Sequence, residues 1–217
     1  MKIRISLVAV SLALIAAPVV AKDKVKADAA EPVVVTCEGV FGPKSTDALV
    51  RETFGDENVE TGTVYGVEGI EFKATTVFPN DPERVMQFSW WDEDNLEYLS
   101  SVELAPSQET PTGVKIGMSV KEVEAINGEP FTIGGFWWDY GGGAVFEKGA
   151  LADADPADGC GFWLRFAPKD EYPEGTDVTP VSGEVTVPSS EPLLETLDVR
   201  VQSINLGYAW PEELPQP

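Results

Sequence analysis

The 217-residue sequence contains no histidine, which excludes several kinds of active site. Serine and cysteine hydrolases of the usual type need an imidazole base, and zinc and non-haem iron centres usually take histidine ligands. Neither a Gly-x-x-x-x-Gly-Lys-Ser/Thr phosphate loop nor a Gly-x-Ser-x-Gly nucleophile elbow is present. We therefore expect a protein that is not an enzyme, with no catalytic residue, no metal site and no cofactor.

Basic residues are scarce: 15 Lys and Arg stand against 37 Asp and Glu, for a net charge of −22. Such a chain repels nucleic acid and anionic lipid at long range, so no nucleic-acid partner is expected. Among 37 acids some pair could always serve glycoside hydrolysis, which keeps a carboxylate-based hydrolase acting on envelope glycans as an alternative. The acidic run from Asp153 to Asp158 departs from the EF-hand template and is interpreted as a polar hairpin tip.

Long apolar runs are confined to the N-terminus. Lys2 and Arg4 precede an uncharged apolar stretch over residues 5–18, and small residues follow up to Ala21. This pattern predicts a secretory signal peptide over residues 1–21, with an uncleaved anchor as the alternative. No later stretch reaches the roughly 18 apolar residues of a membrane span, so the mature chain is expected to have no integral membrane segment. The predicted location is periplasmic or secreted.

The sequence has only two cysteines, Cys37 and Cys160, which are 123 positions apart. In an exported chain two cysteines indicate one disulfide, although two free thiols are the alternative. Closing a loop of that length stabilises a fold by at most roughly 5 kcal/mol in the chain-entropy treatment. Residues 22–32 are expected to be a disordered lead-in and residues 211–217 a mobile tail.

Two similar helix patterns indicate an internal duplication. One covers Ser45–Phe54 and ends at Gly55, and the other covers Ser119–Asn127 and ends at Gly128. Ser119 with Glu122 fits a capping box, and each glycine fits a helix stop. We expect strands to follow the helices over Gly69–Phe78, Arg84–Trp91 and Tyr98–Leu104 in the first half, and over Phe136–Tyr140, Ala144–Glu147, Gly161–Phe166 and Leu197–Leu206 in the second.

The sequence therefore predicts an α+β fold of two tandem units, each with short helices packed on an antiparallel β-sheet. Unit 1 covers residues 33–106 and unit 2 covers residues 107–210, with an insertion at 168–195 that forms a long loop or an added hairpin. Side by side, the two units could share one continuous sheet.

The segment from Thr112 to Pro130, followed by Trp137 and Tyr140, resembles the signature of the SmpA/OmlA group of small outer-membrane lipoproteins. It is also similar to the related fold of the beta-lactamase inhibitor protein. The resemblance implies a helical hairpin on an antiparallel sheet, repeated in tandem in the inhibitor, and protein-binding roles. The lipoprotein cysteine is absent, and no functional residue is carried over.

Tandem aromatic residues are the candidate binding residues. Neighbours on a strand point to opposite faces, so Trp90 is expected in the core and Trp91 on the open face. In the second run we place Trp138 and Tyr140 on the open face, beside Asp139. Exposed Trp and Tyr are typical anchors for proteins and other ligands. The alternative is that both pairs fill a wide core beneath residues 168–195.

The resulting functional hypothesis is an exported, non-enzymatic interaction protein, inhibitor-like in mode, that binds an unidentified protein or small ligand through an aromatic sheet face. Alongside the hydrolase, a structural envelope protein without a specific ligand is the other alternative. The sequence fixes neither the partner nor the oligomeric state.

Overall fold

A computed structural model describes residues 33–152 and 159–216 and shows an α+β fold. The expected signal peptide at 1–21, the lead-in at 22–32 and the hairpin tip at Asp153–Asp158 lie outside the described residues. Within the described ranges, no helix is both long and apolar enough to cross a membrane.

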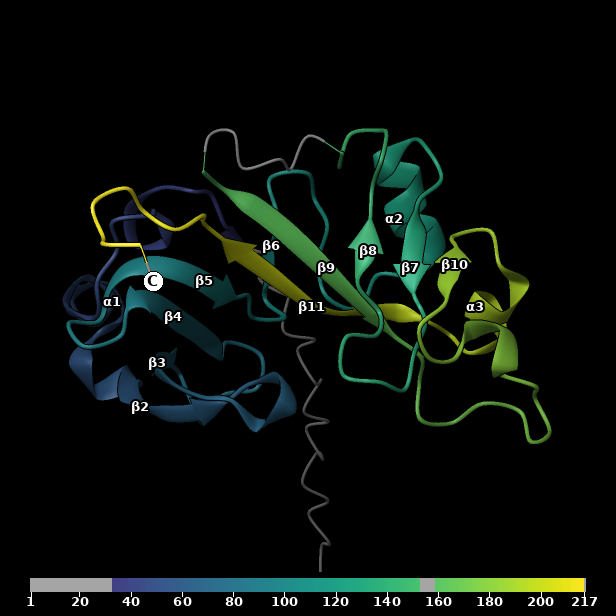
Figure 1. The fold of residues 1–217 in the computed structure, drawn as a ribbon, viewed down its shortest axis with the longest axis horizontal. Helices are drawn as coiled ribbons and strands as arrows, with labels where there is room; N and C mark the ends of the chain where they lie inside the picture. The colour runs from purple at the N-terminus through teal and green to yellow at the C-terminus, as the bar shows by residue number, and fades with distance from the viewer. Residues whose placement is uncertain (1–32, 153–158, 217) are drawn as a thin grey trace, which may run out of the picture. The chain divides into compact units, whose positions relative to one another are not determined.

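The main element is one antiparallel sheet of six strands (Figure 1). In spatial order these are β2 (Val59–Tyr65), β3 (Glu71–Val77), β4 (Met86–Asp92), β5 (Glu97–Glu103), β11 (Arg200–Gly207) and β9 (Gly161–Ala167). The first four strands come from the first half of the chain and the last two from the second. The sheet is therefore continuous across the two halves, because β5 pairs with β11.

Two smaller sheets complete the β-structure. Three short antiparallel strands lie in the order β10 (Thr186–Pro188), β7 (Thr132–Gly134) and β8 (Ala144–Val145). The insertion at 168–195 thus supplies an edge strand, β10, as well as a long loop. A parallel pair joins β1 (Val33–Val34) to β6 (Gln108–Glu109). Figure 1 shows β2–β5 on one side, β7, β8 and β10 on the other, and β11 and β9 crossing between them.

Both predicted helices are confirmed, with ends set by local capping. In α1 (Asp47–Phe54) the Thr46 hydroxyl accepts from the Leu49 N–H, and Gly55 follows with φ 85°. In α2 (Val120–Asn127) Ser119 and Glu122 form the predicted capping box, and Gly128 is left-handed. A short third helix, α3 (Pro192–Thr196), and 3-10 turns η1 (Gly39–Phe41), η2 (Asp56–Asn58), η3 (Val67–Gly69) and η5 (Thr179–Val181) were not predicted.

Helix α1 covers the inner face of the main sheet, where the core lies. Phe88 of β4 is fully buried, and the rings of Phe41 and Phe54 pack against it at 5.7 and 6.3 Å between centroids. Val123 of α2 and Ile204 of β11 belong to the same buried cluster. One core therefore serves both halves of the chain.

The predicted disulfide is formed. Cys37 and Cys160 are bonded, with their Cα atoms 6.2 Å apart. The bond joins the segment before η1 to the residue before β9, and so ties the beginning of the described chain to the far edge of the main sheet. Such a bond forms and persists in an oxidising compartment.

The expected strand at Phe136–Tyr140 is wrong. Strand β7 ends at Gly134, Trp137 has φ 62°, and the chain turns through Trp138 to Tyr140. Left-handed backbone cannot continue a strand, so the alternation assumed for these residues fails. Strand β2 and the short strands β1, β6 and β7 were not predicted. The alternating Val59, Thr61 and Thr63 of β2 fit a strand but were not assigned to one.

Candidate binding face of the sheet

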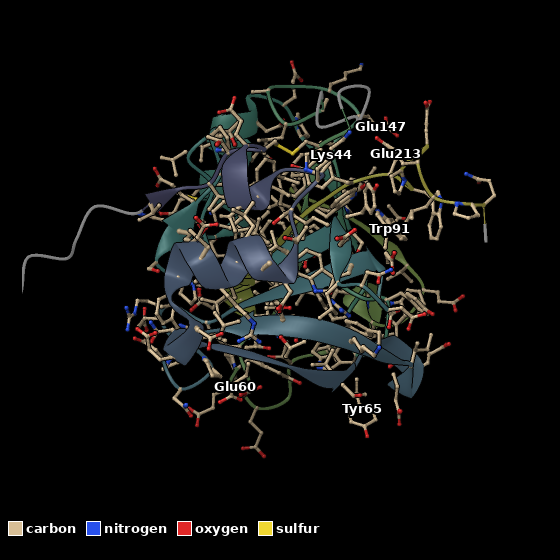
Figure 2. The ribbon with its side chains drawn as sticks, turned by 90° about the vertical axis from the view of Figure 1, so that its left-hand side faces the viewer. Lys44, Glu60, Tyr65, Trp91, Glu147 and Glu213 are labelled. Carbon is tan, nitrogen blue, oxygen red and sulfur yellow. A yellow bond between two sulfur atoms is a disulfide. The ribbon has the colours of Figure 1, made fainter. Side chains whose placement is uncertain are left out.

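The face of the six-stranded sheet opposite α1, here called the open face, carries two rows of residues that cross every strand. Helix α1 lies on the inner face, because its Asp47 carboxylate accepts hydrogen bonds of 2.7 Å from both Thr61 and Thr75. Residues next to these threonines therefore point to the open face. Figure 2 shows Glu60 on the side of β2 and β3 away from α1.

The first row contains only small residues. Consecutive register pairs join Gly62, Ala74, Ser89, Ser101, Gly207 and Gly161 across the sheet. We call this set the small-residue row. Gly62 is exposed and Ser89 and Ser101 are half-exposed, whereas Ala74, Gly161 and Gly207 are buried. Since these side chains end at Cβ or one atom beyond, another molecule could approach the sheet backbone closely at Gly62, Ser89 and Ser101.

The adjacent row carries longer side chains. Register pairs join Glu60, Thr76, Gln87, Glu103, Asn205 and Trp163 in the same spatial order. This polar row offers carboxylates, amides and a hydroxyl, and it ends at a tryptophan whose side chain is 50% exposed. The two rows together are an extended polar surface with one large aromatic anchor.

Trp163 leans across the small-residue row. A Cβ built on Gly207 would lie 2.6 Å from Cζ3 of Trp163, so the indole lies directly over this glycine. Its neighbours along the strand, Phe162 and Leu164, point inward and contribute to the core. The alternation of Gly161–Phe166 was predicted, but Trp163 was not recognised as a site residue. The apolar pattern at 162, 164 and 166 could have placed it on the open face.

The predicted residues Trp138, Asp139 and Tyr140 lie together in the loop between β7 and β8, beside the β9 edge. Arg165 of β9 holds this loop: its guanidinium donates to the Asp139 carbonyl at 2.6 Å and to the Gly141 carbonyl at 2.7 Å. Tyr140 is 57% exposed, in the loop rather than on the expected strand. Trp138 is half-buried instead, and its indole N–H donates to the Gly135 carbonyl at 2.9 Å.

The inward placement expected for Trp137 is wrong. Its side chain is 51% exposed and lies 6.3 Å from the Tyr172 ring, centroid to centroid. Tyr172 belongs to the 168–195 insertion, so that segment touches part of the aromatic run. Trp138 and Tyr140 also pack on each other at 5.5 Å.

Trp91 lies at a different place from the other predicted residues. Trp90 is buried, as expected, whereas Trp91 is half-buried and packs 5.1 Å from the Trp210 ring near the C-terminus. Both indole N–H groups are buried and lack a hydrogen-bond partner among the described residues. Nearby, Lys44 forms a 2.8 Å ion pair with Glu213, and Figure 2 shows these two beside each other. No aromatic pair among the described residues joins Trp91 to the β7–β8 loop.

A recess of about 260 Å³ opens beside the polar row at Glu103. Polar side chains from Thr76, Gln87, Glu103 and Gln202 contribute to it, and Pro82, Val85, Pro106 and Ile116 are among its apolar walls. Although the Glu103 side chain reaches solvent, partial burial raises the pKa of its carboxyl, and no hydrogen bond or cation offsets this. The recess thus holds a carboxylate without a partner.

Within residues 33–152 and 159–216, no cluster of three or more potential metal ligands is present. In comparisons with family models, curated proteins and solved structures, nothing matches this chain. The resemblance to the SmpA/OmlA group and the inhibitor fold therefore stays a prediction.

Proposed function

We propose that the chain is an exported, non-enzymatic binding protein that recognises a partner protein through the open face of its six-stranded sheet. The observation that carries the proposal is the pair of rows crossing all six strands, with Trp163 at one end. Their half-exposed hydroxyl and amide groups can hydrogen-bond a partner, and tryptophan is a frequent centre of interface energy.

The proposed site residues differ in exposure and in position on the face. Trp163, Tyr140 and Asp139 are exposed near the β9 edge, and Trp138 supports that loop from a half-buried position. Trp91, on the interior strand β4, takes part through its contact with Trp210. The net charge of −22 favours a basic partner surface, since opposite charges speed and orient association.

Tandem architecture is part of the same proposal. The elements α1-β2-β3-β4-β5 and α2-β7-β8-β9-β11 follow the same order, except that the second half carries β10 and α3 between β9 and β11. Strand β8 touches β9 through the bridge between Gly143 and Arg165. In each half the helix N-cap also bridges the first residue of the last strand: Thr46 pairs with Glu97, and Ser119 pairs with Arg200. These parallels support a duplication in which β5 and β11 form the junction.

The hydrolase alternative finds less support. A glycosidase needs two carboxyl groups within roughly 5–9.5 Å across the sugar. The other acid of the polar row, Glu60, stands three strands from Glu103, or about 14 Å at the usual strand spacing.

Site-specific photocrosslinking in the cells that make the protein tests the proposal. A photoreactive residue replaces Ser101, in the middle of the small-residue row, and as a control replaces Glu52, which is exposed on α1. We expect a discrete protein adduct from position 101 and none from position 52. The same adducts from both positions, or none from position 101, would refute the open face as the binding surface.

A further inference from the structure

The recess beside Glu103 combines a single carboxylate with neutral hydrogen-bond acceptors. Gln87 lies directly opposite Glu103 in the register, and Gln202 reaches the recess from the irregular point of β11. Side-chain amides and the Thr76 hydroxyl each offer an acceptor oxygen. This arrangement suits a group that donates several hydrogen bonds and carries positive charge.

The remaining walls are apolar and come from outside the polar row. Pro82 and Val85 precede β4, Pro106 follows β5, and Ile116 precedes α2. These side chains are suited to the methylene stem of a long side chain, because such stems pack on apolar surface while the charged end finds its partner.

Glu103 has no role within the fold that accounts for its charge. Burial alone raises the pKa of its carboxyl, and no described cation or donor compensates the charged form. A glutamine would fill the same space without this cost. The opposite charge from a bound molecule would supply the missing compensation.

We propose that this recess accepts an arginine side chain of the partner protein, its guanidinium on Glu103 and the amides of Gln87 and Gln202, and its stem against Pro82, Val85 and Ile116. This rests on the proposed function and adds the chemistry of the partner. Arginine fits because its planar guanidinium has five donors, is weakly hydrated and is enriched at interfaces. The acidic character of the whole chain complements such a partner.

The test is a titration followed by NMR, with N-acetyl-arginine amide as the probe and N-acetyl-citrulline amide as its neutral isostere. The proteins are the wild type, Glu103→Gln and the control Glu52→Gln. The control removes the same charge from an exposed position on α1, outside the open face. Side-chain amide signals of Gln87 and Gln202 report on the recess.

We expect saturable shifts of these two amides with the arginine probe, and affinity at least fivefold weaker in Glu103→Gln but within twofold of wild type in Glu52→Gln. The citrulline probe should bind at least fivefold more weakly than arginine. Equal arginine affinity in Glu103→Gln and wild type, or no saturable shift at Gln87 and Gln202, would overturn the inference. If position 101 still crosslinks a partner, only the arginine recess is refuted. If the recess binds arginine but position 101 gives no protein adduct, the proposed function is refuted instead.

Discussion

The indole of Trp163 covers Gly207 on the neighbouring strand, at the place where the small-residue row meets the aromatic end of the polar row. A Cβ on Gly207 would also lie 2.9 Å from the Ser100 carbonyl oxygen, which cannot move freely because it accepts the Tyr208 N–H. The absence of a side chain at 207 therefore sets the position of the exposed tryptophan.

Replacing Gly207 by alanine should displace Trp163 and destabilise the fold by about 1–3 kcal/mol, as expected for overpacking at a tight contact. The matched control is Gly62→Ala in the same row, where a new Cβ meets nothing within 4 Å. Urea denaturation of both variants measures the free energy of unfolding. Equal stability of the two variants would show that Trp163 does not depend on a bare position at 207.

Asp47 connects α1 to the sheet. Burial opposes its charge, but hydrogen bonds from Thr61, Thr75 and Arg51 outweigh burial and hold the pKa of the Asp47 carboxyl below its usual value. Asp47→Asn should cost about 1–3 kcal/mol near neutral pH, the range for hydrogen bonds to charged groups. Asp56→Asn, which removes an exposed partner of the same Arg51, should cost less than about 1 kcal/mol.

The pH dependence of the Asp47 contribution follows from the direction of its shift. Because the folded-state pKa is lower than the unfolded value of about 3.9, the stabilisation is complete above that pH and is lost as pH falls through the folded-state pKa. The stability difference between wild type and Asp47→Asn, measured by denaturation from pH 7 down to pH 3, should therefore shrink only in the acid limb. A difference that does not change with pH would contradict the assigned charge.

Glu103 should behave in the opposite way. Burial raises the folded-state pKa of its carboxyl, so the charged carboxylate destabilises the fold. The free energy of unfolding therefore falls as pH rises from the unfolded-state pKa to the folded-state pKa. Glu103→Gln should then raise the melting temperature at pH 7 but not below the unfolded pKa. Thermal unfolding at both pH values provides the check, and a variant less stable than wild type at pH 7 would show that Glu103 has a stabilising partner.

The disulfide should carry a large part of the stability. Reduction, or the paired change Cys37→Ser and Cys160→Ser, opens a loop of 123 residues and should lower the free energy of unfolding by as much as about 5 kcal/mol. Denaturation curves with and without reductant give this value directly. A change below about 1 kcal/mol would mean that the bond adds little to a fold already fixed by its core.

Features with strong local signals were predictable from sequence. The helices at Thr46 and Ser119 begin at side-chain caps and end at Gly55 and Gly128, so both were located correctly. The strands beginning near Met86 and Gly161 follow clear alternation. The disulfide followed from the presence of only two cysteines in a chain that was expected to be exported.

What failed depends on backbone conformation and on contacts far apart in the chain. The alternating pattern of Phe136–Tyr140 predicts a strand and does not indicate that Trp137 adopts a left-handed conformation. Pairing of β5 with β11 places Glu103 beside Asn205, more than a hundred positions later, and only this register reveals the two rows. Trp163 was not predicted as a site residue because it is a single tryptophan between Phe162 and Leu164, whereas the predicted site residues belong to runs with two consecutive tryptophans.

We propose the open face as the surface that binds the partner. The most direct test measures how tightly the partner, identified as the adduct from position 101, binds two purified variants of this protein. Ser101→Tyr fills the small-residue row, and Glu52→Tyr adds the same bulk on α1. We predict at least tenfold weaker binding by Ser101→Tyr and wild-type affinity for Glu52→Tyr. Undiminished binding by Ser101→Tyr would show that the partner binds elsewhere.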